Sequence, residues 1–350
     1  MKHPIRILFT LLLSFFILGS IQLISNFSPT SKKNELHISV YNDYLDLDMI
    51  DAFTKETGIK VHLHFFNSNE ELITKIQFSK GEGLDLLIPS DYTCKILADK
   101  GVLQPIDRSK LDFLDRIYPF LLNKDFDKGN NYSIPYTWEA YGILFDPNQL
   151  QMKEFTINDY FNPSFQKVMT GDLIEATSIA SYTLYKDKRD LSEGEIEELT
   201  SFLKTQNKSV RAYADFRGKD IVASTSAAYG MVKTSFLDAI HRENPHLKFS
   251  LTKDTFFTSI ENVVILKKSK NLDQIYTFLN YIYKAENLAL TANLFPCYPA
   301  CEDTFAHPNN HCDLYFDTIE EIKLRPLQMQ LFYYCSDPEK VRNMFIKSKV

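Results

Sequence analysis

The sequence is poor in tryptophan and cysteine and has no excess of basic residues. Its 350 residues include one Trp and five Cys, against 27 Phe and 19 Tyr, so aromatic faces must come mainly from Phe and Tyr. The formal net charge is −6, and Lys2 and Arg6 lie in the N-terminal segment, so the rest of the chain is more acidic still. An acidic chain without a basic stripe binds nucleic acid and anionic lipid poorly and favours cationic partners. We expect no nucleic-acid partner.

Sequence motifs of common enzymes are also missing. The chain has no Gly-x-Ser-x-Gly, no His-Glu-x-x-His, no Walker loop and no Gly-x-Gly-x-x-Gly. His62 and His64 alternate along an expected strand, and we interpret them as packed or solvated side chains rather than metal ligands. We therefore predict that the protein is not an enzyme, and we expect no cofactor and no metal site.

The N-terminus has the pattern of a targeting segment. Lys2 and Arg6 precede an uncharged apolar run over residues 7–24, which is typical of a secretory signal. The run approaches the roughly 20 residues that span a bilayer, so an uncleaved anchor is the alternative. We assign residues 1–26 to a signal peptide or N-terminal anchor and 27–35 to a polar tether. No Cys lies near the end of the run, so we do not expect a lipid-modified N-terminal Cys.

The cysteines gather near the C-terminus. Cys94 stands alone, whereas four others lie in the last sixth of the chain: Cys297, Cys301, Cys312 and Cys335. In an exported protein such a cluster suggests one or two disulfides. Together with His307 and His311 it also imitates a zinc cluster, but its spacing is not that of a standard finger. We favour disulfides or free thiols, with the pairing left open.

Strand and helix patterns alternate after the tether. We expect strands at 37–40, 59–66, 84–88 and 263–266, and helices at 46–56, 70–78, 91–100, 192–203 and 272–283. Gly58 marks a helix end, and Ser192 with Glu195 forms a capping box. This alternation is typical of an α/β fold, in which ligands bind at the carboxyl ends of strands. A chain of this length exceeds one core of about 100–150 residues, so we expect two domains.

Four motifs in a fixed order resemble a known family. They are Phe53-Thr-Lys-Glu-Thr-Gly-Ile-Lys-Val61, Asn67-Ser-Asn-Glu70, Leu84-Asp-Leu-Leu-Ile-Pro-Ser-Asp-Tyr92 and Asn131-Tyr-Ser-Ile-Pro-Tyr-Thr-Trp138. Together they resemble the periplasmic spermidine/putrescine-binding proteins of ABC importers. The resemblance runs from Leu36 to the C-terminus and is dense as far as Phe145.

The resemblance implies a fold and a function. It implies a two-lobed α/β periplasmic-binding-protein fold of type II with the ligand cleft between the lobes, lobe 1 being 36–139 plus 261–305 and lobe 2 being 140–260 plus 306–350. The protein would be periplasmic and monomeric, would capture spermidine or putrescine, and would deliver it to an ABC permease of the inner membrane. A polyamine needs spaced carboxylates for its ammonium groups and aromatic faces for its methylenes.

The resemblance also implies the site residues. Tyr41 and Tyr44 match an aromatic pair, Ser90 and Tyr92 a Pro-Ser-x-Tyr turn, and Asp172 and Glu175 an Asp-x-x-Glu pair that holds ammonium groups. Glu261 stands where the family has Asp. The remaining expected contacts, which rest on thinner likeness, are Phe295 and Gln328. Ser90 could equally cap a helix, and Asp172 and Glu175 could equally be acids of a first helical turn.

The chain departs from the family at two tryptophans. Ser226 and Ser259 stand where the family has further Trp residues, and we expect Tyr229 and Phe257 to replace them. Three carboxylates, those of Asp172, Glu175 and Glu261, suit three ammonium groups, so the sequence favours spermidine over putrescine.

Other functions remain open from the sequence alone. They are a receptor for another cationic solute or for ferric ion, and an exported enzyme or adhesin on the same fold. Tyr333-Tyr334 resembles the paired tyrosines of ferric-ion receptors, but we expect a helix there, in which neighbouring side chains diverge.

Overall fold

The computed structural model describes residues 34–349 except 43, 153, 216, 296 and 309–315. The predicted leader, the tether as far as residue 33, His311 and Cys312 lie outside the described residues. The elements and the cavity described below belong to one compact unit, Leu36–Val350. No helix of the described part is long and apolar enough to cross a membrane.

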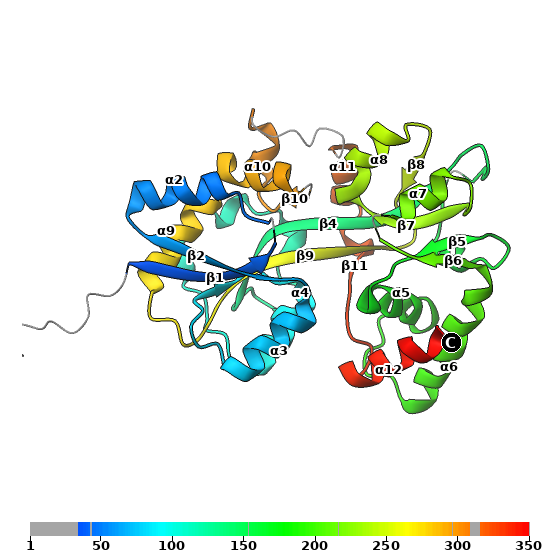
Figure 1. The fold of residues 1–350 in the computed structure, drawn as a ribbon, viewed down its shortest axis with the longest axis horizontal. Helices are drawn as coiled ribbons and strands as arrows, with labels where there is room; N and C mark the ends of the chain where they lie inside the picture. Colours follow the sequence, from blue (N-terminus) through cyan, green and yellow to red (C-terminus); the bar gives the residue numbers. More distant parts are fainter. Residues whose placement is uncertain are drawn as a thin grey trace, which may run out of the picture. The chain divides into compact units, whose positions relative to one another are not determined.

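Strands and helices alternate as the sequence predicts (Figure 1). The strands are β1 (Glu35–Tyr41), β2 (Lys60–Phe66), β3 (Leu86–Leu87), β4 (Ser133–Phe145), β5 (Lys167–Met169), β6 (Val210–Tyr213), β7 (Tyr229–Lys233), β8 (Lys248–Ser250), β9 (Phe256–Ile265), β10 (Tyr298–Pro299) and β11 (Met329–Leu331). The α-helices are α2 (Leu47–Thr57), α3 (Asn69–Ser79), α4 (Asp91–Asp99), α5 (Leu173–Tyr185), α6 (Glu193–Gln206), α7 (Gly218–Ala223), α8 (Leu237–Glu243), α9 (Leu272–Ile282), α10 (Ala285–Leu294), α11 (Phe316–Leu324) and α12 (Pro338–Ser348).

Helix ends follow local chemistry. Asp46 caps α2 by accepting the Met49 amide at 2.8 Å, and Gly58 ends that helix with φ of 71°, a left-handed conformation that favours glycine. The expected capping box of Ser192 and Glu195 is present at the start of α6. One expectation is wrong: Tyr333 and Tyr334 lie in a loop after β11, not in a helix.

Two long strands link the two sides of the sheet. The strand order is β2-β1-β3-β9-β4-β7-β5-β6, with β8 and β10 on β4 and β11 on β9. β4 and β9 pair antiparallel from Ser133 opposite Val264 to Ala140 opposite Thr258, and Figure 1 shows them side by side between the two groups of helices. They connect the β1–β3 side of the sheet to the β5–β7 side.

The buried side chains form two large clusters joined by β4. Trp138 and Ala140 belong to the first cluster, and Tyr141 and Ile143 to the second. Two cores within one unit make the fold two-lobed. Residues of α11, which the sequence-based division assigns to lobe 2, pack in the first cluster through Ile319 and Ile322.

Gly142 permits the close packing of β4 in the second lobe. It pairs with Val232 of β7, and a Cβ at this position would lie 2.7 Å from the Ser250 carbonyl oxygen and closer still to the Phe249 ring. We expect Gly142→Ala to lower the free energy of unfolding by about 1–3 kcal/mol, because a well-packed core resists added volume.

Urea unfolding monitored by circular dichroism measures this loss. Gly194→Ala is the matched control, because Gly194 lies in α6 and a Cβ added there would have no atom within 4 Å. That change should raise stability by about 0.5–1 kcal/mol, since Ala favours the helix over Gly. Equal midpoints for the two variants would contradict the packing argument.

Candidate ligand-binding site

A cavity of about 370 Å³ lies between the two lobes, and its walls come from both clusters. This volume is within the usual range of small-molecule sites. Eight of the nine residues expected from the sequence line it: Tyr41, Tyr44, Ser90, Tyr92, Asp172, Glu175, Glu261 and Phe295.

The ninth expected residue, Gln328, is not among the lining residues. Its side-chain oxygen bonds to the guanidinium of Arg325, and its carbonyl accepts the Thr255 hydroxyl at 2.9 Å. Phe332, a few residues later, lines the cavity instead.

The first-lobe wall is a chain of hydrogen bonds that ends on Glu261. Asn69 Nδ2 donates to Tyr41 Oη at 2.5 Å and to Ser90 Oγ at 2.8 Å. Ser90 Oγ donates in turn to Glu261 Oε1 at 2.7 Å. Ser90 is the N-cap residue of α4, but its hydroxyl makes no capping bond. Its hydroxyl is therefore committed to orienting the carboxylate.

Glu261 keeps one carboxylate oxygen unused. Oε2 is inaccessible to solvent and has no hydrogen-bond partner among the described residues. Burial raises the pKa of the Glu261 carboxyl to about 8, and the nearby acids Asp91 and Glu139 add to this effect. No cation of the described part of the chain contacts the ionised carboxyl, and a ligand ammonium group in the cavity would supply that counter-charge.

The second-lobe wall is built at the start of α5. Asp172 is the N-cap residue, and its Oδ1 accepts the amides of Ile174 at 2.7 Å and Glu175 at 2.9 Å. Burial, followed by the charge of Glu175, raises the pKa of Asp172 to about 7. Asp172 therefore caps α5 and also lines the cavity, so its capping role and its proposed ligand contact are compatible.

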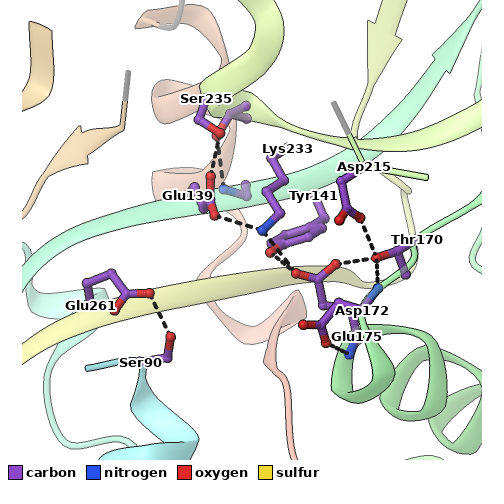
Figure 2. A network of polar contacts seen from close by, with 12 residues as sticks. Ser90, Glu139, Tyr141, Thr170, Asp172, Glu175, Asp215, Lys233, Ser235 and Glu261 are labelled. Atoms are coloured by element: carbon purple, nitrogen blue, oxygen red, sulfur yellow. Dashed lines mark hydrogen bonds and ion pairs between the residues drawn. The ribbon is translucent and has the colours of Figure 1, made fainter. Parts of the chain in front are cut away.

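Glu175 is surrounded by donors from its own lobe. Tyr141 Oη donates to its Oε1 at 2.6 Å, and the Thr170 hydroxyl lies 2.5 Å from its Oε2. The ammonium of Lys233 lies 3.0 Å from Oε1 (Figure 2). Little acceptor capacity is left for a ligand.

Lys233 and Glu139 are site residues that sequence reasoning missed. The Lys233 ammonium also lies 3.5 Å from Glu139 Oε1 and 5.2 Å from the centre of the Tyr141 ring. The surrounding carboxylates hold the pKa of Lys233 well above its ordinary value despite burial, so it is charged. A lysine at the end of the strand Gly230-Met-Val-Lys233 was the only signal available in the sequence.

Aromatic side chains also line the cavity. Tyr41 packs on Phe66 with ring centres 4.3 Å apart, and Tyr44 on Phe295 at 5.1 Å. The only Trp in the sequence, Trp138, is fully buried and also lines the cavity. Of these rings, Tyr41 and Phe295 are partly exposed and offer apolar faces to methylene groups and π faces to cations. Phe66, Tyr44 and Trp138 are buried.

The expected substitutes for the two missing tryptophans lie elsewhere. Tyr229 is buried and donates to the Asp159 carbonyl at 2.9 Å, and Phe257 stacks on Phe332 within the second cluster. Neither lines the cavity, because each packs in its lobe's core. Of the two aligned serines, Ser259 lines the cavity and Ser226 does not.

Of the remaining candidates for metal or sulfur chemistry that the structure describes, Cys297 lines the cavity and the others do not. Tyr333 Oη donates to the Lys186 carbonyl, whereas Tyr334 Oη donates to Glu70, so the adjacent tyrosines point apart. Cys94, Cys301 and Cys335 are buried thiols without a disulfide. Burial raises the pKa of Cys301 to about 12 and of Cys335 to about 11.

Comparison with known proteins identifies the family to which the chain belongs. Residues 48–311 match the family described as bacterial extracellular solute-binding protein. The chain belongs to this family. The match begins within α2 and covers most of the first lobe, both crossing strands and most of the second lobe.

The curated relatives are described as periplasmic proteins that bind spermidine, putrescine or both. A spermidine/putrescine-binding periplasmic protein of Haemophilus influenzae is 28% identical over 271 residues, covering 75% of each chain. The spermidine/putrescine-binding periplasmic protein of Escherichia coli is 26% identical, covering 77% of this chain and 78% of its own. The putrescine-binding protein PotF of E. coli is also 26% identical, over 301 residues, covering 79% of this chain and 80% of its own.

Solved structures agree on the fold. A spermidine/putrescine ABC transporter substrate-binding protein of Streptococcus pneumoniae superposes with a TM-score of 0.71 at 24% identity, covering 90% of this chain and 98% of that one. The iron-bound HitA of Pseudomonas aeruginosa has a TM-score of 0.66 at 15% identity, with 90% and 99% covered. Receptors for different solutes thus share the two-lobed fold, and the ligand has to be argued from the cavity.

Proposed function

We propose that the protein is a receptor that captures a polyamine between its lobes and delivers it to an ABC importer, without catalysing a reaction. The observation that carries this proposal is the composition of the cavity. Five carboxylates line it together with aromatic rings: Glu70, Glu139, Asp172, Glu175 and Glu261. Spaced acids and apolar faces are what a flexible chain of methylenes and ammonium groups requires.

The names of the curated relatives support the same ligand class, since those proteins are described as binding spermidine, putrescine or both. Ferric ion is disfavoured by the divergence of Tyr333 and Tyr334. The eight expected residues that line the cavity remain proposed ligand contacts. We also propose that the chain crosses between the lobes near residues 140 and 260. The protein is proposed to act as a monomer.

Calorimetric titration of the full chain tests the ligand class. We expect putrescine or spermidine to bind with a Kd below about 1 µM. Ferric citrate and γ-aminobutyrate serve as the competing ligands, and 1,4-butanediol as the uncharged control. Silence with both amines, or tighter binding of a competitor, would overturn the polyamine proposal.

We also propose that the N-terminal segment exports the protein to the periplasm, as a cleaved signal or an uncleaved anchor. Mass spectrometry of the N-terminus in fractionated cells distinguishes cleavage from anchoring. Recovery only from the cytosol with Met1 intact would contradict export.

A further inference from the structure

The cavity contains an ammonium group of the chain's own. Lys233 ends β7 and pairs in register with Tyr141 of β4, so both side chains reach the same wall of the cavity. Its side chain is 25% exposed, against 13% for Glu139 and 9% for Glu175, which it contacts. Figure 2 shows Lys233 directed at these two acids.

These contacts remove two acids from the set available to a ligand. Glu175 already receives Tyr141, Thr170 and Lys233. Glu139 Oε2 accepts the Ser235 hydroxyl at 2.6 Å, and its Oε1 faces Lys233. A ligand ammonium placed here would meet a fixed positive charge, which opposes its binding.

Two lining acids, Glu261 and Asp172, form no ion pair with a described side chain. Glu261 Oε2 has no partner, and Asp172 uses only Oδ1 in its capping bonds, as far as the described residues show. Figure 2 shows Glu261 and Asp172 at separate places in the site. A linear chain with one ammonium group at each end could reach both while its methylenes lie along the aromatic walls.

A third ammonium group would gain little. Glu70, the remaining acid, is exposed, and its Oε1 already accepts Tyr334 Oη at 3.2 Å. An ion pair at such an exposed place contributes little because water and salt screen it. The other two lining acids, Glu139 and Glu175, are shared with Lys233.

We infer that Lys233 fills one ammonium position of the cavity with the chain's own side chain, so that the site takes a linear diamine in preference to a triamine. This inference rests on the proposed polyamine function and reverses the preference that counting acids in the sequence suggests. That count includes Glu175 as a free carboxylate, and the structure shows it paired.

Titrations of the full chain with putrescine, cadaverine and spermidine at one ionic strength and about pH 8.5 test the inference. We expect the better diamine to bind at least about tenfold more tightly than spermidine, as one unfavourable charge contact would produce. Spermidine binding equally or more tightly overturns the inference. Silence with all three amines overturns the polyamine function instead.

Two variants test the role of Lys233 directly. Lys233→Met leaves Glu139 and Glu175 without their cation, so spermidine should gain at least about tenfold relative to the diamine. In Lys233→Met/Glu175→Gln only Glu139 is left without its cation, so the gain of spermidine should be smaller than in the single variant. An unchanged ratio in the single variant would overturn the inference. The wild-type titrations decide the preference even if the single variant fails to fold.

Discussion

Glu261→Gln is expected to remove most of the ligand affinity. Gln keeps the length of the side chain and an oxygen for the Ser90 hydroxyl, which lies 2.7 Å from Oε1 in the structure. It lacks the negative charge that would serve a ligand ammonium group in the cavity as counter-charge. Leaving a desolvated ammonium group without its counter-charge costs about 2–5 kcal/mol, which is a loss of roughly 30-fold to 5,000-fold in Kd.

Calorimetry with a diamine at about pH 8.5 measures this loss, because Glu261 is then largely ionised in the wild type. Glu70→Gln is the matched control: it removes the same charge from an exposed lining residue. Exposed ion pairs contribute about 0–1 kcal/mol, so the control should lose less than about fivefold. Comparable losses in the two variants would show that the acids act through the general field of the cavity and not through a contact at Glu261.

Local sequence signals predicted the helix ends of both lobes well. Asp46, Gly58 and the Ser192/Glu195 box act within a few residues of chain, and each has the conformation expected of it. Such signals depend on backbone geometry and nearby hydrogen bonds, which a short segment carries by itself. The helices at 47–57, 91–99 and 272–282 follow from them and from apolar spacing.

The long-range partners of the site could not be found in this way. Lys233 enters the cavity only because β7 pairs with β4 so that it lies opposite Tyr141, which is far away in the sequence. Glu139 meets it because β4 crosses between the lobes at this point. A single sequence does not contain the register of strands so far apart, because that register is set by the packing of whole sheets.

Most of the acids and tyrosines expected from the family motifs line the cavity, whereas the residues expected to replace the two missing tryptophans do not. Asp172, Glu175 and Glu261 follow motifs and line the cavity. Tyr229 and Phe257 stand close in sequence to the aligned positions, yet both are buried in the second cluster. Proximity along the chain does not fix the face of a strand, since successive side chains point to opposite sides.

Ligand affinity should rise steeply with pH. Burial raises the pKa of Glu261 to about 8 and of Asp172 to about 7 in the free protein, so both carboxyls are mainly protonated at about pH 6. A bound ammonium group favours the ionised forms, so binding below these pKa values must expel protons. If both pKa values fall below 6 in the complex, affinity for a diamine drops by about 10²-fold for Glu261 and about tenfold for Asp172 between pH 9 and pH 6.

Titrations across this range, repeated in two buffers of different ionisation enthalpy, measure both the affinity and the protons released. In Glu261→Gln the pH dependence should shrink to about the tenfold that Asp172 contributes. An affinity that is flat from pH 6 to pH 9 would mean that no ligand ammonium pairs with either carboxyl.

The free protein should show the opposite trend in stability. A carboxyl whose pKa is raised on folding contributes stability that is full below its unfolded pKa of about 4 and is lost as pH rises through the folded value. Glu261 and Asp172 should therefore lower the Tm of the free protein between about pH 4 and pH 8, the window set by their pKa values of about 8 and about 7. A bound diamine offsets that loss, so the rise in Tm on adding ligand should grow over the same window. Thermal melts with and without putrescine measure it, and a ligand-induced shift that is largest at low pH would contradict the assignment of these two carboxyls as the ammonium sites.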